Sequence, residues 1–284
     1  LFFKRVREIA KYASDAEGIQ RNLLKRLVGK AESTEWGIRH NYSAISDYEQ
    51  FARTVSVQDY ESLKGYIDRM RHGEKDVLWK GRCKWYAKSS GTTNDRSKFI
   101  PVTEDGLQRA HYKGGFDTVA QYLANNPSSR FLSGKGLILG GSHAPNYNVA
   151  GSLVGDLSAI LIENCSPFVN MLRVPGKDIA LLSDFEEKMD RIARATSGMK
   201  ITNISGVPSW MMAVLKHMLD ITGKSSVDEI WPDLEVFFHG GVAFTPYREQ
   251  YHQIIRNSNM KYMETYNASE GFFAMQNDPA DPAM

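Results

Sequence analysis

The chain has 284 residues, 42% of them hydrophobic and 24% charged, a composition typical of a globular protein and unlike that of disordered or collagen-like chains. Its 35 basic and 33 acidic residues leave a net charge of +2 without a basic patch interleaved with aromatic residues, so nucleic acid is not an expected partner. The chain has two cysteines, Cys83 and Cys165, which lie far apart in the sequence and exclude a disulfide framework, so we expect a cytoplasmic protein. No apolar run approaches the roughly 18 residues of a membrane helix, so a membrane is not an expected partner.

The N-terminal part of the chain, residues 1–75, is expected to form a helical segment that packs on the main domain. Apolar residues recur at helical spacing through the first thirty residues, which predicts an amphipathic helix or a pair of helices. A further helix is expected from Asp59 to Met70. The chain begins without Met and stops soon after its last motif, so we expect it to be a piece of a longer protein.

The remaining residues, 76–284, are expected to form an α/β core. Strands are predicted over residues 83–88 and 98–102, joined by the loop Ser89-Ser90-Gly91-Thr92-Thr93. A long helix with Thr103 as its N-cap should follow, ending near residue 124.

Downstream, strand and helix signals alternate, which predicts mostly parallel sheets flanked by helices. Pro208 and Pro246 each open an expected helix. Because the carboxyl ends of parallel strands meet at one edge of a sheet, the loops that follow these strands should gather where open α/β sheets bind ligands. The strands are predicted over residues 137–139, 200–204, 234–238 and 261–265.

The loop from Ser89 to Thr93 presents four hydroxyl groups around one glycine. The glycine would let the backbone approach a ligand closely, and phosphate oxygens are the natural acceptors for such donors. The loop lacks the Gly-Lys-Ser/Thr ending of a Walker loop, which argues against a P-loop NTPase. A solvated turn between two strands is the alternative interpretation.

Two later loops carry groups suited to a nucleotide. A ring such as adenine could lie flat against the peptide planes of Gly240-Gly241-Val242, although a plain strand-to-helix turn has the same appearance. In the segment from Tyr266 to Gly271, the tyrosine ring could stack on a base, Ser269 could bond a phosphate and Glu270 could hold Mg²⁺. A core tyrosine and a solvated glutamate are the alternative there.

Taken together, these motifs resemble in order and spacing the adenylate-forming superfamily, which includes the acyl-CoA and aryl-CoA synthetases and firefly luciferase. The run from Ser89 to Pro101 is most similar to the plant auxin-responsive Gretchen Hagen 3 acyl acid amido synthetases and their bacterial relatives. The segments 34–40, 59–67 and 206–210 extend the resemblance over nearly the whole chain.

The resemblance implies a large N-terminal adenylation domain of an ATP-dependent ligase. Such an enzyme activates a small carboxylic acid as an acyl-adenylate and passes the acyl group to an amine, usually that of an amino acid, with ATP and Mg²⁺ as cofactors. It further implies that Glu270 holds the metal and that Thr92, Thr93, Glu270 and Lys98 act in catalysis. Lys98 would equally suit a solvated strand position. The implied nucleotide-binding residues are Ser89, Ser90, Gly91, Thr92, Thr93, Gly240, Gly241, Val242, Tyr266, Asn267 and Ser269.

Two parts of the family pattern have no counterpart in this sequence. One is a Tyr-Arg-x-Gly-Asp segment whose aspartate holds the ribose, and the other is a smaller C-terminal domain with a catalytic lysine. We therefore expect a domain that is incomplete at its C-terminus, binds nucleotide weakly and turns over poorly or not at all. The alternatives are an acyl-CoA ligase, which differs in its acceptor thiol, and a catalytically silent acid-binding or nucleotide-binding module.

Several side chains expected at the carboxyl edge of the parallel sheet could form the pocket for the acid. Packing in the core is the alternative, above all for Met211. His143 and His239 could touch substrate or titrate near neutrality, although a lone histidine is more often simply hydrogen-bonded. No Gly-x-Ser-x-Gly elbow and no His-Glu-x-x-His run supports a hydrolase or a zinc enzyme. The pocket candidates are Ser142, His143, Trp210, Met211 and Phe244.

Overall fold

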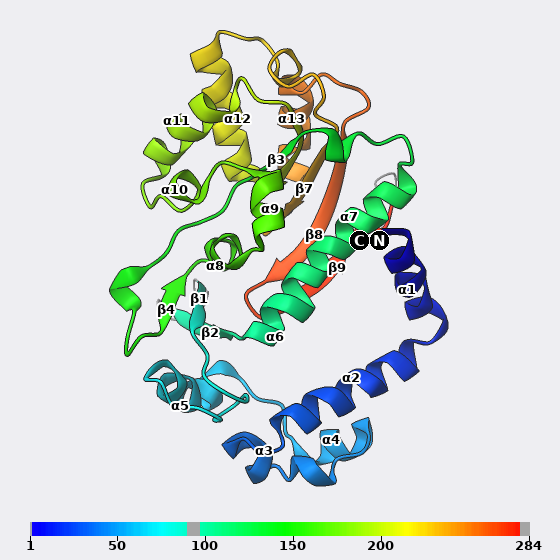
Figure 1. Ribbon diagram of the computed structural model, residues 1–284, viewed down its shortest axis with the longest axis vertical. Coiled ribbons are helices and arrows are strands. Elements are labelled where there is room, and N and C mark those ends of the chain that lie inside the picture. Colours follow the sequence, from blue (N-terminus) through cyan, green and yellow to red (C-terminus); the bar gives the residue numbers. More distant parts are fainter. Residues whose placement is uncertain (1, 90–96, 279–284) are drawn as a thin grey trace. The chain divides into compact units, whose positions relative to one another are not determined.

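The computed structural model describes residues 2–89 and 97–278, and the chain divides into two compact units (Figure 1). Unit 1 consists mainly of Phe3–Gly106 and Ala144–Gly155, whereas unit 2 consists mainly of Leu107–His143 and Asp156–Met284. The first strands of the expected α/β core therefore cluster with the N-terminal helices.

The helices of unit 1 begin at short polar side chains that cap them. Asp15, Thr34, Asp47 and Asp59 each accept a hydrogen bond from the backbone N–H three residues further on, which satisfies a donor that has no partner within the helix. The cap at Asp15 separates the first thirty residues into a pair of helices. The helices are α1 (Phe2–Ser14), α2 (Ala16–Ala31), α3 (Glu35–Arg39), α4 (Tyr48–Thr54), α5 (Tyr60–Arg71) and α6 (Glu104–Gly106), with 3₁₀ turns at Tyr42–Ala44 and Pro145–Tyr147.

Unit 1 also holds a small three-stranded sheet. Strand β1 (Trp85–Ser89) pairs antiparallel with β2 (Lys98–Val102) and parallel with β4 (Leu153–Gly155). The pairing of Ser89 with Lys98 confirms that the hydroxyl-rich loop joins two strands. Ile67 and Met70 of α5 pack with residues of β1 and β4 in a buried cluster beneath the sheet.

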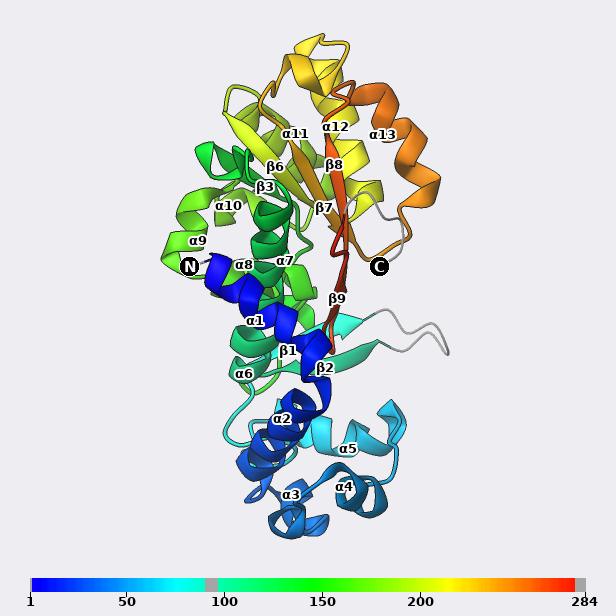
Figure 2. The same ribbon diagram turned by 90° about the vertical axis from the view of Figure 1, so that its right-hand side faces the viewer.

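Unit 2 is built on a six-stranded sheet in the order β5-β3-β6-β7-β8-β9 (Figure 2). Neighbouring strands run parallel from β5 to β8, and β9 alone pairs antiparallel, which confirms the expected mostly parallel sheet. The strands are β3 (Lys135–Ile138), β5 (Arg173–Val174), β6 (Ile201–Gly206), β7 (Val236–Gly240), β8 (Lys261–Ala268) and β9 (Gly271–Met275).

Successive residues of each central strand are buried on opposite faces of the sheet. Ile204 and Phe237 pack with the helices α11, α12 and α13 on one face, whereas Phe238 and Met263 pack with Tyr122 of α7 on the other. The helices of unit 2 are α7 (Tyr112–Asn125), α8 (Leu157–Asn164), α9 (Pro167–Leu172), α10 (Lys177–Ala180), α11 (Phe185–Thr196), α12 (Pro208–Thr222) and α13 (Arg248–Ile254), with 3₁₀ turns at Phe131–Ser133, Val227–Glu229 and Thr245–Tyr247.

The long helix expected after Thr103 is present, but it is not uniform. The Thr103 hydroxyl accepts a hydrogen bond from Gly106 N at 3.1 Å, so the expected cap is confirmed. A π-helical turn, Leu107–His111, then separates α6 from α7. Such turns are rare in proteins, and those that occur often lie at functional sites.

Helix α7 packs closely against β9 because Gly114 has no side chain. A Cβ atom at Gly114 would overlap the ring of Phe272, whereas a Cβ atom at the next residue, Gly115, would meet nothing within 4 Å. Gly114 is buried and Gly115 is exposed. The two adjacent glycines therefore form a matched pair in which only one is required by packing.

We predict that Gly114→Ala lowers the free energy of unfolding by about 1–3 kcal/mol, because the new methyl group forces Phe272 or the helix to move. Gly115→Ala should instead leave stability unchanged or raise it by about 0.5–1 kcal/mol, since alanine favours the helix. Urea unfolding of both variants measures the difference. Equal effects of the two substitutions would contradict the close contact between α7 and β9.

Candidate functional site

The carboxyl edge of the six-stranded sheet brings together most of the sequence-predicted site residues that lie in unit 2. Ser142 and His143 follow β3, the start of α12 with Trp210 and Met211 follows β6, and Gly241 follows β7. Of the residues expected to bind phosphate, Ser90, Gly91, Thr92 and Thr93 lie outside the described residues. Ser89 is the last residue of β1 in unit 1.

The segment from Tyr266 to Gly271 is a β-hairpin and not the loop that its sequence suggested. Strand β8 continues to Ala268, three residues beyond its expected end, and β9 returns after a turn at Ser269 and Glu270. Tyr266 is nevertheless 54% exposed, so its ring has a surface on which a ligand could stack. The apolar run after Gly271 is the sequence signal from which β9 could have been predicted, since two extended runs separated by two turn residues are typical of a hairpin.

A buried histidine holds the hairpin from the side of α7. His111, the last residue of the π-helical turn, places Nδ1 2.7 Å from Oδ1 of Asn267, in a geometry that suits donation from Nδ1–H to the amide oxygen. Burial lowers the pKa of His111, and the hydrogen bond to Asn267 opposes that shift. No local pattern in the sequence marks His111, because the contact joins residues 156 positions apart.

The two glycines at the carboxyl end of β7 serve packing within the protein. A Cβ atom at Gly240 would overlap the backbone oxygen of Thr265, and Gly241 has a φ of +86°, a conformation that favours glycine. The open space inferred for an adenine ring at Gly240 is therefore filled by β8. Val242, at 42% exposure, is the member of the motif that offers surface.

His239, Phe244 and Met211 lie in the interior. His239 is 3% exposed and stacks on Phe244 with 4.2 Å between ring centroids, while Phe244 and Met211 belong to the main buried cluster. Burial lowers the pKa of His239 to about 4, so the expectation that it titrates near neutrality is wrong. The core alternative fits Met211 and Phe244 better than the acid pocket does, whereas Trp210 is 39% exposed beside Phe185.

The loop that presents Ser142 and His143 is held by a buried lysine and a half-buried aspartate. Lys188 of α11, 3% exposed, donates from Nζ to the backbone oxygens of Gly140 at 3.1 Å and Gly141 at 2.9 Å. Asp156 accepts from Ser142 N at 2.9 Å. Burial lowers the pKa of Lys188, and the nearby Asp156 charge opposes that shift. Lys188 and Asp156 carried no sequence signal, because nothing local marks a lysine that will be buried.

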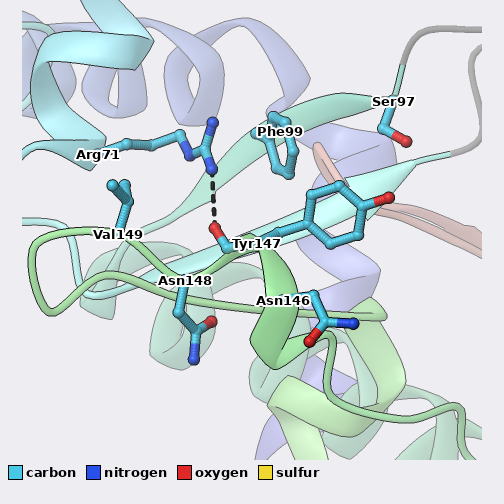
Figure 3. Close-up of a pocket in the computed structure, with 7 residues that line it drawn as sticks. All are labelled: Arg71, Ser97, Phe99, Asn146, Tyr147, Asn148 and Val149. Carbon is cyan, nitrogen blue, oxygen red and sulfur yellow. Dashed lines mark hydrogen bonds between the residues drawn. The ribbon is translucent and has the colours of Figure 1, made fainter.

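In unit 1, the residues next to the hydroxyl-rich loop contact aromatic rings. Lys98 Nζ lies 5.6 Å from the centre of the Tyr60 ring, and Lys88 Nζ lies 4.2 Å from that of Tyr147, within the range of cation–π contacts. A cavity of about 530 Å³ adjoins β2 (Figure 3). It is lined by Arg71, Ser97, Phe99, Asn146, Tyr147, Asn148 and Val149, and none of these is a sequence-predicted site residue.

Across residues 2–89 and 97–278, no three His, Cys, Asp or Glu side chains gather as a metal cluster. Over the same ranges, no helix has both the length and the apolar character needed to cross a bilayer.

We predict that His239 makes stability depend on pH. Its pKa of about 4 in the folded protein lies below the roughly 6.5 of an unfolded histidine, so the unfolded state binds more protons between these values. The stabilisation is complete above about pH 6.5 and is lost as the pH falls toward 4, by on the order of 3 kcal/mol. Urea unfolding should show a flatter pH profile for His239→Gln than for the wild type.

The exposed His252 supplies the control, because His252→Gln also removes one imidazole. A His239→Gln profile as steep as those of the wild type and His252→Gln would show that the buried ring does not have the lowered pKa.

Comparison with known proteins finds plant relatives over part of the chain. The probable indole-3-acetic acid-amido synthetase GH3.7 of Oryza sativa subsp. japonica is 32% identical over 108 residues, which are 36% of this chain and 17% of that protein. The indole-3-acetic acid-amido synthetase GH3.5 of Arabidopsis thaliana is 26% identical over 107 residues, which are 37% of this chain and 18% of that protein.

Solved structures extend the likeness of fold over nearly the whole chain. The AtGH3.15 acyl acid amido synthetase in complex with 2,4-DB matches 99% of this chain with a TM-score of 0.79 and 15% identity. A second structure of the GH3.15 acyl acid amido synthetase matches 93% of the chain with a TM-score of 0.70 and 19% identity. The chain spans little more than half of these proteins, 58% and 54%. Since the sequence model of the GH3 family N-terminal domain matches residues 5–260, well over half of the chain, this protein belongs to the GH3 family.

Proposed function

We propose that this chain is part of the adenylating domain of an ATP-dependent acyl acid amido synthetase. The observation that carries the proposal is the β8–β9 hairpin at the carboxyl edge of the parallel sheet, where an exposed aromatic ring, a hydroxyl and a carboxylate come together in Tyr266, Ser269 and Glu270. Membership of the GH3 family and the names of the plant relatives support the same activity.

The exposed groups of the hairpin fit the parts of ATP. The ring of Tyr266 has the free surface that stacking on a purine needs, and Val242 offers apolar surface after β7. The hydroxyl of Ser269 suits a phosphate oxygen, and Ser89, with Ser90, Thr92 and Thr93, would supply further donors to the phosphates. Asn267, held by His111, would keep the strand and its neighbour Tyr266 in place.

Glu270 is the proposed metal ligand. It is exposed at the turn, and a single protein carboxylate completed by substrate phosphates is a usual way to bind Mg²⁺. When bound, Mg²⁺ would supply positive charge beside the phosphates. Lys98, whose ammonium group lies 5.6 Å from the centre of the Tyr60 ring, would add a further positive charge.

In the proposed reaction, a carboxylate oxygen of the acid attacks the α-phosphorus of ATP. The bond between the α-phosphorus and the oxygen that bridges it to the β-phosphate breaks, and pyrophosphate leaves. The amine nitrogen then attacks the acyl carbon, the bond to AMP breaks and the amine loses a proton. Both the attacking carboxylate and the phosphates are negative, so hydroxyl and amide donors that neutralise charge in the transition state would accelerate the first step.

The proposal is tested with the full-length protein by ATP–pyrophosphate exchange over a panel of carboxylic acids, followed by product analysis with amino acids and with coenzyme A. We expect acid-dependent exchange and an amide product. Tyr266→Ala should raise the KM for ATP about tenfold or more, and Tyr266→Phe should stay near the wild type, because ring stacking is retained. A thioester product would assign the chain to an acyl-CoA ligase, and absence of exchange with every acid would refute adenylation. The 284-residue chain alone is expected to bind ATP weakly and to exchange poorly.

A second prediction concerns the metal. Glu270→Gln keeps the shape of the side chain but removes its charge, so exchange should fall about 100-fold and require a higher Mg²⁺ concentration. Glu249→Gln, which neutralises another exposed glutamate of unit 2, is the matched control and should behave as the wild type. An unchanged Mg²⁺ dependence in Glu270→Gln would mean that this carboxylate does not hold the metal.

A further inference from the structure

The β8–β9 hairpin contains a bulge beside Tyr266. Thr265 pairs with Met275 and Tyr266 with Ala274, but Asn267 pairs with Phe272 and not with Phe273. Phe273 is thus the extra residue on β9, opposite no single residue of β8. Bulges of this kind redirect a side chain and are frequent next to functional sites.

The redirected side chain contacts the tyrosine. The ring of Phe273 lies 5.0 Å from that of Tyr266 between centroids, with 33° between the ring planes. In an unbroken ladder, Phe273 would stand opposite Asn267. The bulge is therefore what allows the two rings to meet.

Both rings are unusually exposed to solvent for aromatic side chains. Tyr266 is 54% and Phe273 is 58% exposed, so the pair buries little apolar surface and contributes little to the stability of the fold. The other side of the hairpin is where its anchoring contacts lie, since Asn267 bonds to His111 and Phe272 fills the space above Gly114. An exposed aromatic pair on a firmly held hairpin is better explained by a ligand than by packing.

We propose that Phe273 is a positioning residue for the nucleotide base, acting through Tyr266. This inference rests on the proposed function and adds a residue to it. A lone exposed tyrosine would exchange among rotamers, and ordering its ring on binding would weaken affinity. Contact with Phe273 restricts the Tyr266 ring before the base arrives, so that one face of the ring is backed by the phenylalanine and ring surface remains free for the purine.

The test measures the KM for ATP, the KM for the acid and kcat in the full-length protein, together with calorimetric binding of ATP. Phe273→Ala should raise the KM and Kd for ATP about three- to tenfold, the range that corresponds to ordering one side chain, and leave kcat and the KM for the acid unchanged. Phe273→Tyr should restore the wild-type values, since it keeps the ring. Phe168→Ala, which removes a 66% exposed phenylalanine from α9, is the control for loss of surface apolar area.

A double-mutant cycle separates positioning from direct contact. In a Tyr266→Ala background, Phe273→Ala should have no further effect on the KM for ATP, because the residue that it positions is gone. A further loss there would show that Phe273 touches the base itself and would overturn the positioning role. An unchanged KM for ATP in the single variant, or a change in the KM for the acid instead, would also overturn the inference while leaving the proposed function intact. A wild-type protein that neither binds ATP nor catalyses exchange would refute the proposed function, and the inference with it.

Discussion

The pairing of β7 with β8 is the constraint on which the rest of unit 2 depends. At its carboxyl end, Gly240 stands opposite Thr265, and the backbone oxygen of Thr265 occupies the space that a side chain at Gly240 would need. The hydroxyl of Thr265 also donates to the backbone oxygen of His239 at 3.1 Å. This close approach sets the register in which β8 continues into the hairpin. A larger residue at 240 would therefore displace Tyr266 and Glu270 even though it touches neither.

Buried polar groups behind the sheet edge complete this arrangement. Lys188 donates to the backbone of the loop after β3, and His111 bonds to the side chain of Asn267 in the hairpin. The half-buried Asp156 accepts from the backbone of the same loop. Burying a charge such as that of Lys188 is unfavourable unless it is paired, and two backbone oxygens together with the Asp156 carboxylate provide that compensation. Removing any one partner would leave another polar group buried without its bond. The loops at the edge are consequently fixed in place, whereas the groups proposed to bind a ligand stay exposed.

The candidate site therefore separates into a buried supporting layer and an exposed surface. Met211, Phe244 and His239 belong to the first, and Tyr266, Phe273 and Glu270 to the second. Position in the chain does not separate the two groups, since His239 and Tyr266 both lie near the carboxyl ends of neighbouring strands. Only burial distinguishes a methionine that fills the core from a tyrosine that offers a free ring.

Much of the fold follows from local signals. The cap at Thr103 and the helix that begins at Pro208 lie where the sequence placed them. The helix expected from Asp59 to Met70 and the strands on either side of the hydroxyl-rich loop lie within two residues of their expected bounds. Prediction failed where distant residues decide the structure. Strand β8 extends beyond Thr265 because β9 returns to pair with it, and the long helix after Thr103 contains a π-helical turn that ends in His111, which bonds Asn267.

The sequence by itself determined the alternation of strands and helices, the parallel sheet and the motifs of the GH3 family, because these depend on residues close together in the chain. The tertiary structure alone decided that His239 is neutral and buried, that Lys188 holds the loop after β3 and that a bulge sets Phe273 against Tyr266. Those outcomes depend on which residues, distant in the chain, come into contact and on how far they exclude water from one another. No single segment of the sequence encodes either.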